Sequence, residues 1–355
     1  MKLFNRLILI GNILLLLLTL GAYLAPYIPP SKSGIIAILG LGYPALLMAN
    51  IAFILYWLLF KPKWALASFL VLLLGITHIF GLFGINIPAK AKANTTTLNI
   101  ASFNMQFSKP VRDTNKARGR TMDKGFRQFL HQFQDLDILC VQEHSGFAEA
   151  RIKEELNLPY KYASTRNYVA IYSKYPIVKS GRLKNFSTNK ALSCIWANIA
   201  IKKKIIRVYS VHLEANQKDG IIPKKVVETE KEGPFNSSMA LGLLKHYQTF
   251  SIKRVTQAKR IWEHQKKSPY LSILCGDMNE TPQAHVYRIL ANGRQDTFRE
   301  RGFGLGATFG STFKNKLACL RLDYIFTHPK FKILKHQIFP SIFSDHYLIQ
   351  AEIQL

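Results

Sequence analysis

Long apolar runs near the start of the chain give way to short apolar runs that end in polar residues. Three of the early runs contain no charged side chain and are long enough to cross a membrane as helices: Leu7–Ile28, Ile35–Phe60 and Trp64–Ile87. A membrane-spanning helix needs about 20 mostly apolar residues. The pattern therefore predicts three transmembrane helices.

A cleaved signal peptide is the alternative for the first run, because Lys2 and Arg6 form a basic region ahead of it. No small-residue cleavage site is clear and two more long runs follow, so we favour an uncleaved anchor. Residues 88–97 (PAKAKANTTT) are polar and typical of a linker. We expect a membrane anchor over residues 1–93 and a second domain over residues 94–355.

After the linker, apolar runs of strand length alternate with helical patterns. The strand-like runs are LNIASFNM, DILCVQE, YVAIYS, SCIWANIAI, IIRVYSVHL, LSILCGDMN, RLDYIFTH and LIQAEIQL. Helical patterns lie near Met122–Phe133, Glu149–Leu156, Phe250–Gln265 and Ala284–Leu290. The βα alternation is not strict, which predicts an α/β domain of two packed mixed sheets with helices on their outer faces.

Charge adds a hint about partners. The net charge is +27, and residues 1–93 hold seven basic residues and no acidic one. The remaining chain still carries 41 basic against 21 acidic residues. Such a domain attracts nucleic acid, anionic lipid head groups or small phosphorylated molecules. A basic surface that only aids solubility is the alternative.

Two further features bear on the class of site. The four cysteines lie after residue 93 without CxxC spacing, so we expect neither a zinc site nor a disulfide framework. Residues 215–247 are polar and rich in glycine and proline. A loop of this length is usually functional or disordered, and we expect it to select substrate or touch the membrane.

The strongest chemical signal is a set of apolar, strand-like runs that end in carboxylate, amide or imidazole groups. The residues are Asn104, Glu143, His212, Asp277, Asn279, Asp323, Asp345 and His346. Strands that end in such residues can gather them at a sheet edge. Carboxylate and amide oxygens favour hard cations such as Mg²⁺, Mn²⁺ or Ca²⁺. The pattern indicates metal-assisted attack on a phosphate ester.

The order and amino-acid sequences of these runs resemble those of the endonuclease/exonuclease/phosphatase superfamily of DNase I-like, metal-dependent phosphohydrolases. The resemblance extends from about Leu98 to the C-terminus. It implies a four-layer sandwich of two mixed β-sheets flanked by helices, here preceded by the three transmembrane helices.

The resemblance also implies a role for each residue. Glu143 is the main metal ligand, Asn104 helps to hold the metal or phosphate, and Asp345 adds a second carboxylate. Asp277 orients or deprotonates the attacking water, while Asn279 and His212 bind the charge on the phosphate. Asp323 and His346 form an Asp–His pair for proton transfer. The expected cofactor is Mg²⁺ or Mn²⁺.

Three positions need comment. Gln106 stands where some relatives carry an acid, which puts a second metal site in doubt. Arg254 and Gln257 resemble the family's R-x-x-Q-A stretch, but we interpret them as a solvated helix face with a packing glutamine.

These patterns predict a membrane-anchored phosphoester hydrolase of the phosphodiesterase or endonuclease type. The alternatives are a phospholipid or sphingomyelin head-group phosphodiesterase and a catalytically silent membrane binding module. Expected partners are the lipid bilayer and a phosphoester substrate, either nucleic acid or anionic lipid, with no obligate protein partner. We expect the protein in a bacterial inner (plasma) membrane. Loop charges weakly favour placing the catalytic domain on the extracytoplasmic side, which is the periplasm in a Gram-negative cell.

Overall fold

The computed structural model describes residues 2–93, 95–108, 116–164, 168–184, 191–216, 237–310 and 320–355. Contacts divide the chain into two units. The first comprises Met1–Leu82, Ala215–Thr256 and Glu280–Ile289. The second comprises Phe83–Glu214, Gln257–Asn279 and Leu290–Leu355.

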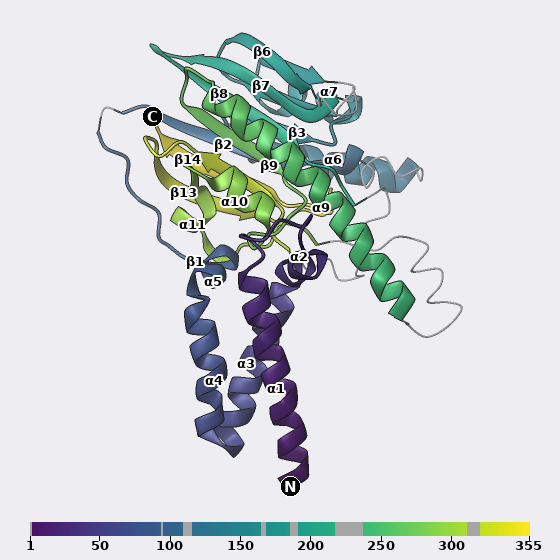
Figure 1. Ribbon diagram of the computed structural model, residues 1–355. Coiled ribbons are helices and arrows are strands. Elements are labelled where there is room, and N and C mark those ends of the chain that lie inside the picture. Colours follow the sequence, from purple (N-terminus) through teal and green to yellow (C-terminus); the bar gives the residue numbers. More distant parts are fainter. Residues whose placement is uncertain are drawn as a thin grey trace. The chain divides into compact units, whose positions relative to one another are not determined.

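Two six-stranded sheets form the second unit (Figure 1). The first runs in the order β10 (Gln295–Asp296), β12 (Asp323–Thr327), β9 (Ser272–Asp277), β8 (Lys204–His212), β7 (Ala191–Ile201) and β6 (Ile177–Lys184). The second runs in the order β13 (Lys332–Phe339), β14 (Leu348–Gln354), β2 (Thr97–Asn104), β3 (Ile138–Gln142), β5 (Val169–Ser173) and β4 (Tyr160–Ser164).

Both sheets are mixed, because β8 pairs in parallel with β9, and β2 with β3, among antiparallel neighbours. Alternation along β2 explains the layering: Leu98 and Ile100 join the core shared with the other sheet, whereas Ala101 and Phe103 face a second core. Helices α6 (Lys116–His131) and α7 (Gly146–Glu155) contribute Phe126 and other side chains to that second core. The prediction of two mixed sheets flanked by helices is confirmed.

The first unit begins with five apolar helices: α1 (Lys2–Tyr23), α2 (Gly34–Leu41), α3 (Tyr43–Phe60), α4 (Pro62–Leu74) and α5 (Ile76–Leu82). Within the described residues, Phe4–Tyr23 and Tyr43–Phe60 are long and apolar enough to span a membrane. Helices α4 and α5 are bent by 69° relative to each other. They add a third membrane span only if the two helices together are counted as a single span.

The predicted helix boundaries in this region are partly wrong. The second apolar run is two helices, because the chain caps α2 at Gly42 before α3 begins. The third run breaks at Gly75 and finishes as strand β1 (Phe83–Ile85) instead of helix. Hydrophobicity alone does not register these breaks, since glycine leaves an apolar run apolar while ending a helix.

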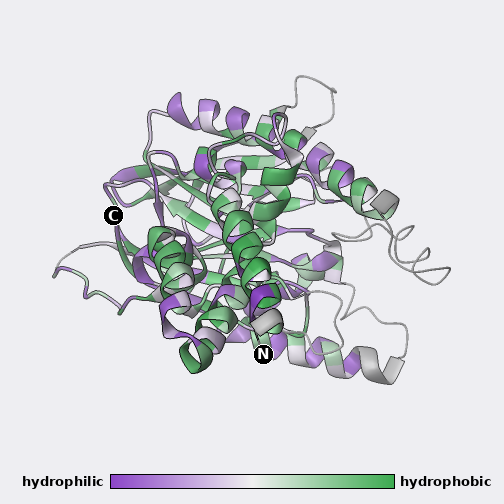
Figure 2. Cartoon of the chain, turned by 60° about the horizontal axis from the view of Figure 1, so that its bottom comes forward, coloured by the Kyte–Doolittle hydropathy of each residue, from purple (hydrophilic) through white to green (hydrophobic). Residues whose placement is uncertain are grey.

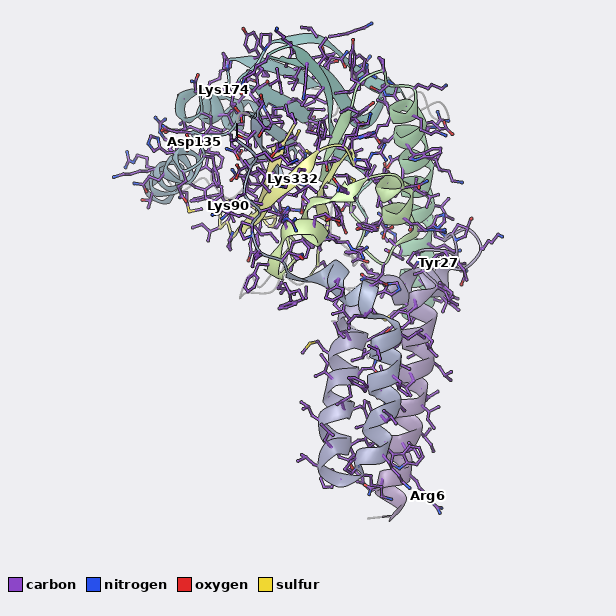
Figure 3. The ribbon with its side chains drawn as sticks, turned by 90° about the vertical axis from the view of Figure 1, so that its left-hand side faces the viewer. Arg6, Tyr27, Lys90, Asp135, Lys174 and Lys332 are labelled. Carbon is purple, nitrogen blue, oxygen red and sulfur yellow. The ribbon has the colours of Figure 1, made fainter. Side chains whose placement is uncertain are left out.

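The helices of the first unit hold polar groups inside and apolar groups outside. Asn12 donates to Ser68 Oγ at 2.9 Å and accepts from Trp57 Nε1 at 2.9 Å, while Asn50 donates to Thr19 Oγ1 at 2.8 Å. Leucines such as Leu14 and Leu17 are more than half exposed. Figure 2 shows the helix at the N label as mainly hydrophobic beyond its start, and in Figure 3 Arg6 and Tyr27 lie near opposite ends of this bundle.

The predicted helices of the second domain exist with shifted ends. They correspond to α6, α7, α9 (Ser237–Lys266) and α10 (His285–Ala291). Because α9 starts at Ser237, the last part of the predicted loop 215–247 is helical, and residues 217–236 lie outside the described part of the chain. Cys140, Cys194 and Cys275 are free and buried; Cys319 lies outside the described residues.

Helix α9 also corrects the interpretation of Arg254. Its side chain is fully buried instead of solvated, and Nε contacts Glu280 Oε1 at 2.9 Å. Tyr247 and Ser251 donate to the same carboxylate, each at 2.6 Å. Gln257 is a packing residue as expected, because its Oε1 accepts from the backbone N–H of Glu214 at 2.9 Å.

Candidate active site

Strand register brings three predicted residues to one level of the first sheet. His212 ends β8 opposite Asp277, which ends β9, and Asp323 begins β12 opposite the same Asp277. Gly276 precedes Asp277 with φ 146°, and a Cβ there would lie 1.9 Å from the Val211 carbonyl oxygen. A glycine is therefore needed for the close approach of β8 and β9 at this point.

The second sheet supplies the other side of the site. Asn104 ends β2 beside Gln142, the last residue of β3, so Glu143 directly follows the parallel neighbour. Asp345 and His346 lie just ahead of β14, and Ser344 Oγ donates to the Asn104 carbonyl oxygen at 2.7 Å. The strand ends thus deliver these groups from both sheets.

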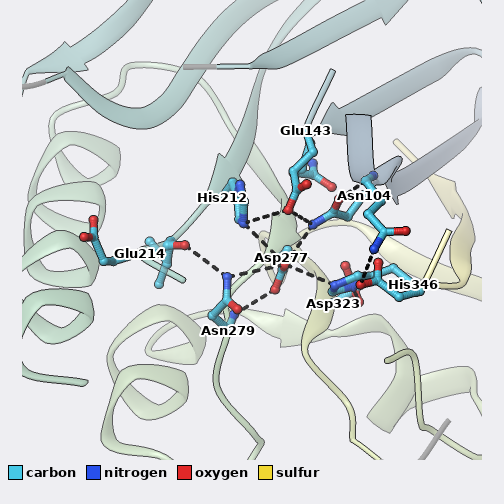
Figure 4. A network of polar contacts seen from close by, with 12 residues as sticks. Asn104, Glu143, His212, Glu214, Asp277, Asn279, Asp323 and His346 are labelled. Carbon is cyan, nitrogen blue, oxygen red and sulfur yellow. Dashed lines mark hydrogen bonds and ion pairs between the residues drawn. The ribbon is translucent and has the colours of Figure 1, made fainter. Parts of the chain in front are cut away.

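Asp277 is the centre of the cluster (Figure 4). Its Oδ2 accepts from Asn104 Nδ2 at 3.0 Å and lies 3.6 Å from Nε2 of both His212 and His346. Its Oδ1 accepts from the backbone N–H of Asn279 at 2.8 Å. A side chain with 1 % exposure is therefore surrounded by donors, as expected because a buried polar group without hydrogen bonds is costly.

Glu143 joins the cluster through two neighbours. Its Oε1 lies 3.4 Å from Asn104 Nδ2, which donates to it, and 3.9 Å from His212 Nε2. Glu143 and Asn279 both adopt left-handed backbone conformations, with φ of 49° and 50°. Such backbones are uncommon outside glycine and concentrate at functional sites.

The predicted Asp–His pair is present. His346 Nδ1 lies 2.8 Å from Asp323 Oδ2, which also accepts from Thr308 Oγ1 at 2.6 Å. Burial alone would lower the pKa of His346, but the charges of Asp323 and Asp277 outweigh it and raise that pKa to about 10. Burial raises the pKa of Asp323, against the opposing effect of His346. The geometry favours a protonated imidazole held between two carboxylates.

Asp345 takes a different position from the other predicted ligands. Its Oδ2 accepts from Gln106 Nε2 at 3.0 Å, and the backbone N–H of Gln106 donates to Asn104 Oδ1 at 3.0 Å. Gln106 thus connects Asp345 to Asn104. The ligand roles of Asn104, Glu143 and Asp345 stay predictions.

Thr308 and Ser344 were missed from the sequence. Thr308 holds Asp323, and Ser344 Oγ accepts from the backbone N–H of His346 at 3.1 Å. Neither residue ends an apolar strand, so the pattern that marked the other groups does not include them. For Ser344, its place directly before Asp345 and His346 was the only available signal.

The donor set fits a hard divalent cation. Carboxylate oxygens of Asp277 and Asp323 lie within 4.8 Å of each other, and both residues are buried; the protonated ring of His346 beside them donates hydrogen bonds and is not counted as a ligand. The buried Oδ1 of Asp323 has no hydrogen-bond partner within the described part of the chain. Glu143 and Asn104 offer further carboxylate and amide oxygens, the ligand types that such cations prefer.

Comparison with known proteins agrees with the fold. The endonuclease/exonuclease/phosphatase family model matches residues 97–346, and a domain of unknown function matches residues 5–82. No curated protein matches the chain in sequence.

Three solved structures illustrate the likeness. An endonuclease/exonuclease/phosphatase from Bacteroides vulgatus is 17% identical, covers 73% of this chain and 99% of its own, and has a TM-score of 0.54. A family protein from Bacteroides thetaiotaomicron is 18% identical, with coverages of 74% and 99% and a TM-score of 0.51. D. rerio TDP2, complexed with single-strand DNA product, is 16% identical, with coverages of 73% and 100% and a TM-score of 0.50.

These structures share the fold, while the family model spans well over half of the chain together with the strand ends described above. The chain belongs to the endonuclease/exonuclease/phosphatase family and is a hydrolase of phosphoric esters.

Proposed function

We propose that this enzyme is a membrane-anchored phosphodiesterase that depends on a divalent cation, Mg²⁺ or Mn²⁺. The observation that carries the proposal is Asp277, whose Oδ2 is approached by Asn104, His212 and His346 from both sheets. A buried carboxylate beside a charged Asp–His pair is suited to orienting water and moving its proton.

Each residue of the site has a separate role in an in-line attack by water on the phosphate. Asp277 orients the water and accepts its proton, and the Asp323–His346 pair stabilises the charge that develops beside it. His212 and Asn279 donate to non-bridging phosphate oxygens. Asn279 Nδ2 now donates to the Leu213 carbonyl at 3.0 Å, so it exchanges this partner for substrate.

Glu143, Asn104 and Asp345 are the residues that we assign to the cation. When bound, the cation would polarise the phosphate and stabilise the leaving oxygen. Carboxylate and amide oxygens select a hard ion over zinc.

The inverted polarity of the first unit supports membrane anchoring. Its polar contacts, such as Asn12 with Ser68 and Trp57, lie inside the helical bundle, and its leucines face outward. In lipid, helices associate through such internal polar groups because the outside needs no shielding. The loop charges favour the periplasmic side for the catalytic unit.

Two substrate classes follow from the chemistry. Nucleic acid suits the basic composition, and TDP2, which shares the fold, has been solved with a single-strand DNA product. A lipid head-group phosphodiester suits an enzyme held at a membrane. The catalytically silent module is disfavoured, because Asn104, His212 and His346 converge on Asp277 and Gln106 connects Asp345 to Asn104.

The test uses the full-length protein in detergent or nanodiscs with Mg²⁺ or Mn²⁺. Its substrates are plasmid DNA, RNA, bis-p-nitrophenyl phosphate and phospholipid vesicles. We expect hydrolysis that EDTA abolishes, that is lost in His346→Ala and that is retained in His131→Ala, a matched change at a largely exposed histidine. A folded protein inactive on all four substrates would contradict the proposal, and the preferred substrate would separate the two classes.

A further inference from the structure

Strands β1 (Phe83–Ile85) and β11 (Phe303–Leu305) form a separate two-stranded ribbon. They pair antiparallel, with Phe83 opposite Leu305 and Ile85 opposite Phe303. All four side chains are exposed, Phe303 at 76 % and Ile85 at 61 %. In strands, alternate residues share a face, so these four apolar side chains form one continuous outer surface.

The inner face of the ribbon carries only glycine. Gly84 and Gly304 are opposite each other, and a Cβ on Gly84 would lie 2.3 Å from the Gly302 carbonyl oxygen. A Cβ on Gly306 would lie 2.7 Å from the Phe298 ring. Around Gly84 this face is closed, whereas a Cβ on Gly304 would meet nothing within 4 Å. Strand β1 therefore cannot slip by one residue to bury Phe83 or Ile85, because the slip would bring a large side chain to the crowded position of Gly84.

This pattern is the reverse of the one found in a strand pair on the surface of a soluble domain. A ribbon on a soluble domain buries its apolar face and blunts its surface with charge. Here Ile87, also 76 % exposed, continues the apolar surface two residues beyond Ile85. A contiguous exposed apolar surface of this kind marks a place where something apolar is contacted.

Chain continuity identifies what the ribbon contacts. Phe83 directly follows Leu82, the last residue of α5 and of the bent apolar helix pair. Three residues extend at most about 10 Å, so the ribbon cannot lie far from the end of that segment. Helix α11 (Thr297–Arg301) lies just ahead of β11 and carries two basic residues, Arg299 and Arg301, and one acidic residue, Glu300. Its net positive charge suits anionic lipid head groups.

We propose that the outer face of the β1–β11 ribbon inserts into the interface of the lipid bilayer that the N-terminal helices cross. The inference rests on the membrane anchoring in the proposed function and adds a second, separate membrane contact. Phe83, Ile85, Phe303 and Leu305 enter the boundary between head groups and acyl chains. The glycine face packs on Phe298.

The ribbon also leads directly to the site. From Leu305 the chain reaches Thr308, the donor to Asp323 Oδ2, in three residues, or at most about 10 Å. The next residue, Phe309, packs its ring 4.8 Å from that of His346. Insertion of the ribbon would hold the Asp–His pair close to the lipid–water interface, where a phosphoester presented by the membrane is within reach.

The test is depth-dependent quenching in the full-length protein. Phe303→Trp is reconstituted in nanodiscs with lipids brominated in the upper acyl chain, and the emission of the parent, with its four tryptophans, is subtracted. We expect the added tryptophan to lose about half of its emission, because apolar faces at the interface lie roughly 5–10 Å deep. Ile85→Trp, on the same face, should behave alike.

Val178→Trp is the matched control, an exposed apolar position on β6. Equal quenching at positions 303 and 178, or none at 303 and 85, would overturn the proposal. The measurement needs no catalysis, so an inactive protein with a quenched ribbon would count against the proposed function alone. Phe303→Asp with Leu305→Asp should leave hydrolysis of bis-p-nitrophenyl phosphate unchanged and abolish quenching of a tryptophan at position 85.

Discussion

His346 and His336 are both buried in the second unit, yet their surroundings shift their pKa values in opposite directions. His346 lies between Asp323 and Asp277, which outweigh burial and raise its pKa to about 10. His336, on β13, contacts Thr297 Oγ1 at 2.8 Å. Burial lowers the pKa of His336 to about 3, and the charge of Arg321 adds to this effect although Asp296 opposes it.

The comparison shows that burial, here aided by the charge of Arg321, keeps a histidine neutral, and that two nearby carboxylates reverse this. A neutral imidazole bonded to a threonine serves packing and hydrogen bonding. An imidazolium held by two carboxylates instead stores charge beside the reacting groups, as catalytic sites require. His336 therefore has a role in the stability of the fold, whereas His346 has a role in the chemistry of the site.

The largest expected effect comes from removing the central charge of the site. Asp277→Asn keeps the shape of the side chain but removes the group that we assign to the attacking water. We expect kcat to fall by roughly 10²–10⁴-fold, the usual contribution of acid–base catalysis. Steady-state hydrolysis of bis-p-nitrophenyl phosphate measures it, and a variant within threefold of wild type would remove Asp277 from the mechanism.

Asp323→Asn should have the next largest effect. The amide can still bond the ring of His346 but no longer stabilises its positive charge, which makes His346 resemble His336. We expect a loss in kcat on the order of 10²-fold with little change in KM. Asp323→Glu keeps the charge and should recover part of the loss; no difference between the two variants would contradict an electrostatic role.

A smaller effect should follow from Thr308→Val. The change removes the hydroxyl that donates to Asp323 Oδ2 at 2.6 Å while keeping a similar volume. A hydrogen bond to a charged group contributes about 1.5–3 kcal/mol, part of which should appear as a loss of about tenfold in kcat. Thr327→Val, at a buried threonine within β12, provides the control. Equal losses in both variants would point to packing instead.

The smallest change is expected at His336 and concerns stability. Its folded pKa of about 3 lies below the ordinary 6.5. Between these values the unfolded chain binds the proton and the folded chain does not, so stability falls as pH falls, by at most about 1.4 kcal/mol per pH unit. Between pH 7 and pH 5, the melting temperature of His336→Gln should decrease less than that of the wild type. Identical losses would show that His336 is not held neutral.

How far the sequence predicted this site depends on the kind of signal. Asn104, Glu143, His212 and Asp277 each end or follow an apolar strand, and strand pairing brings such ends together. Asp323 and His346 meet only through tertiary structure, and a family resemblance was needed to pair them. Thr308 lies in a loop, and the composition of that loop does not predict the hydrogen bond between Thr308 and Asp323.

The same limit applies to the fold. The strands and outer helices of the second unit follow from alternation and periodicity. The apolar run Trp64–Ile87 was predicted as one helix because it is mostly apolar and contains no charged residue. Its last part instead pairs with Phe303–Leu305, and no local pattern indicates a partner so distant in sequence.

The most direct measurement compares the two histidines in the full-length protein. His346→Ala and His336→Gln are assayed on bis-p-nitrophenyl phosphate with Mg²⁺ or Mn²⁺, with melting temperature recorded for both. Our account predicts that His346→Ala stays folded but loses hydrolysis, and that His336→Gln keeps hydrolysis within a few-fold once folded. An active His346→Ala, or a well-folded but inactive His336→Gln, would contradict it.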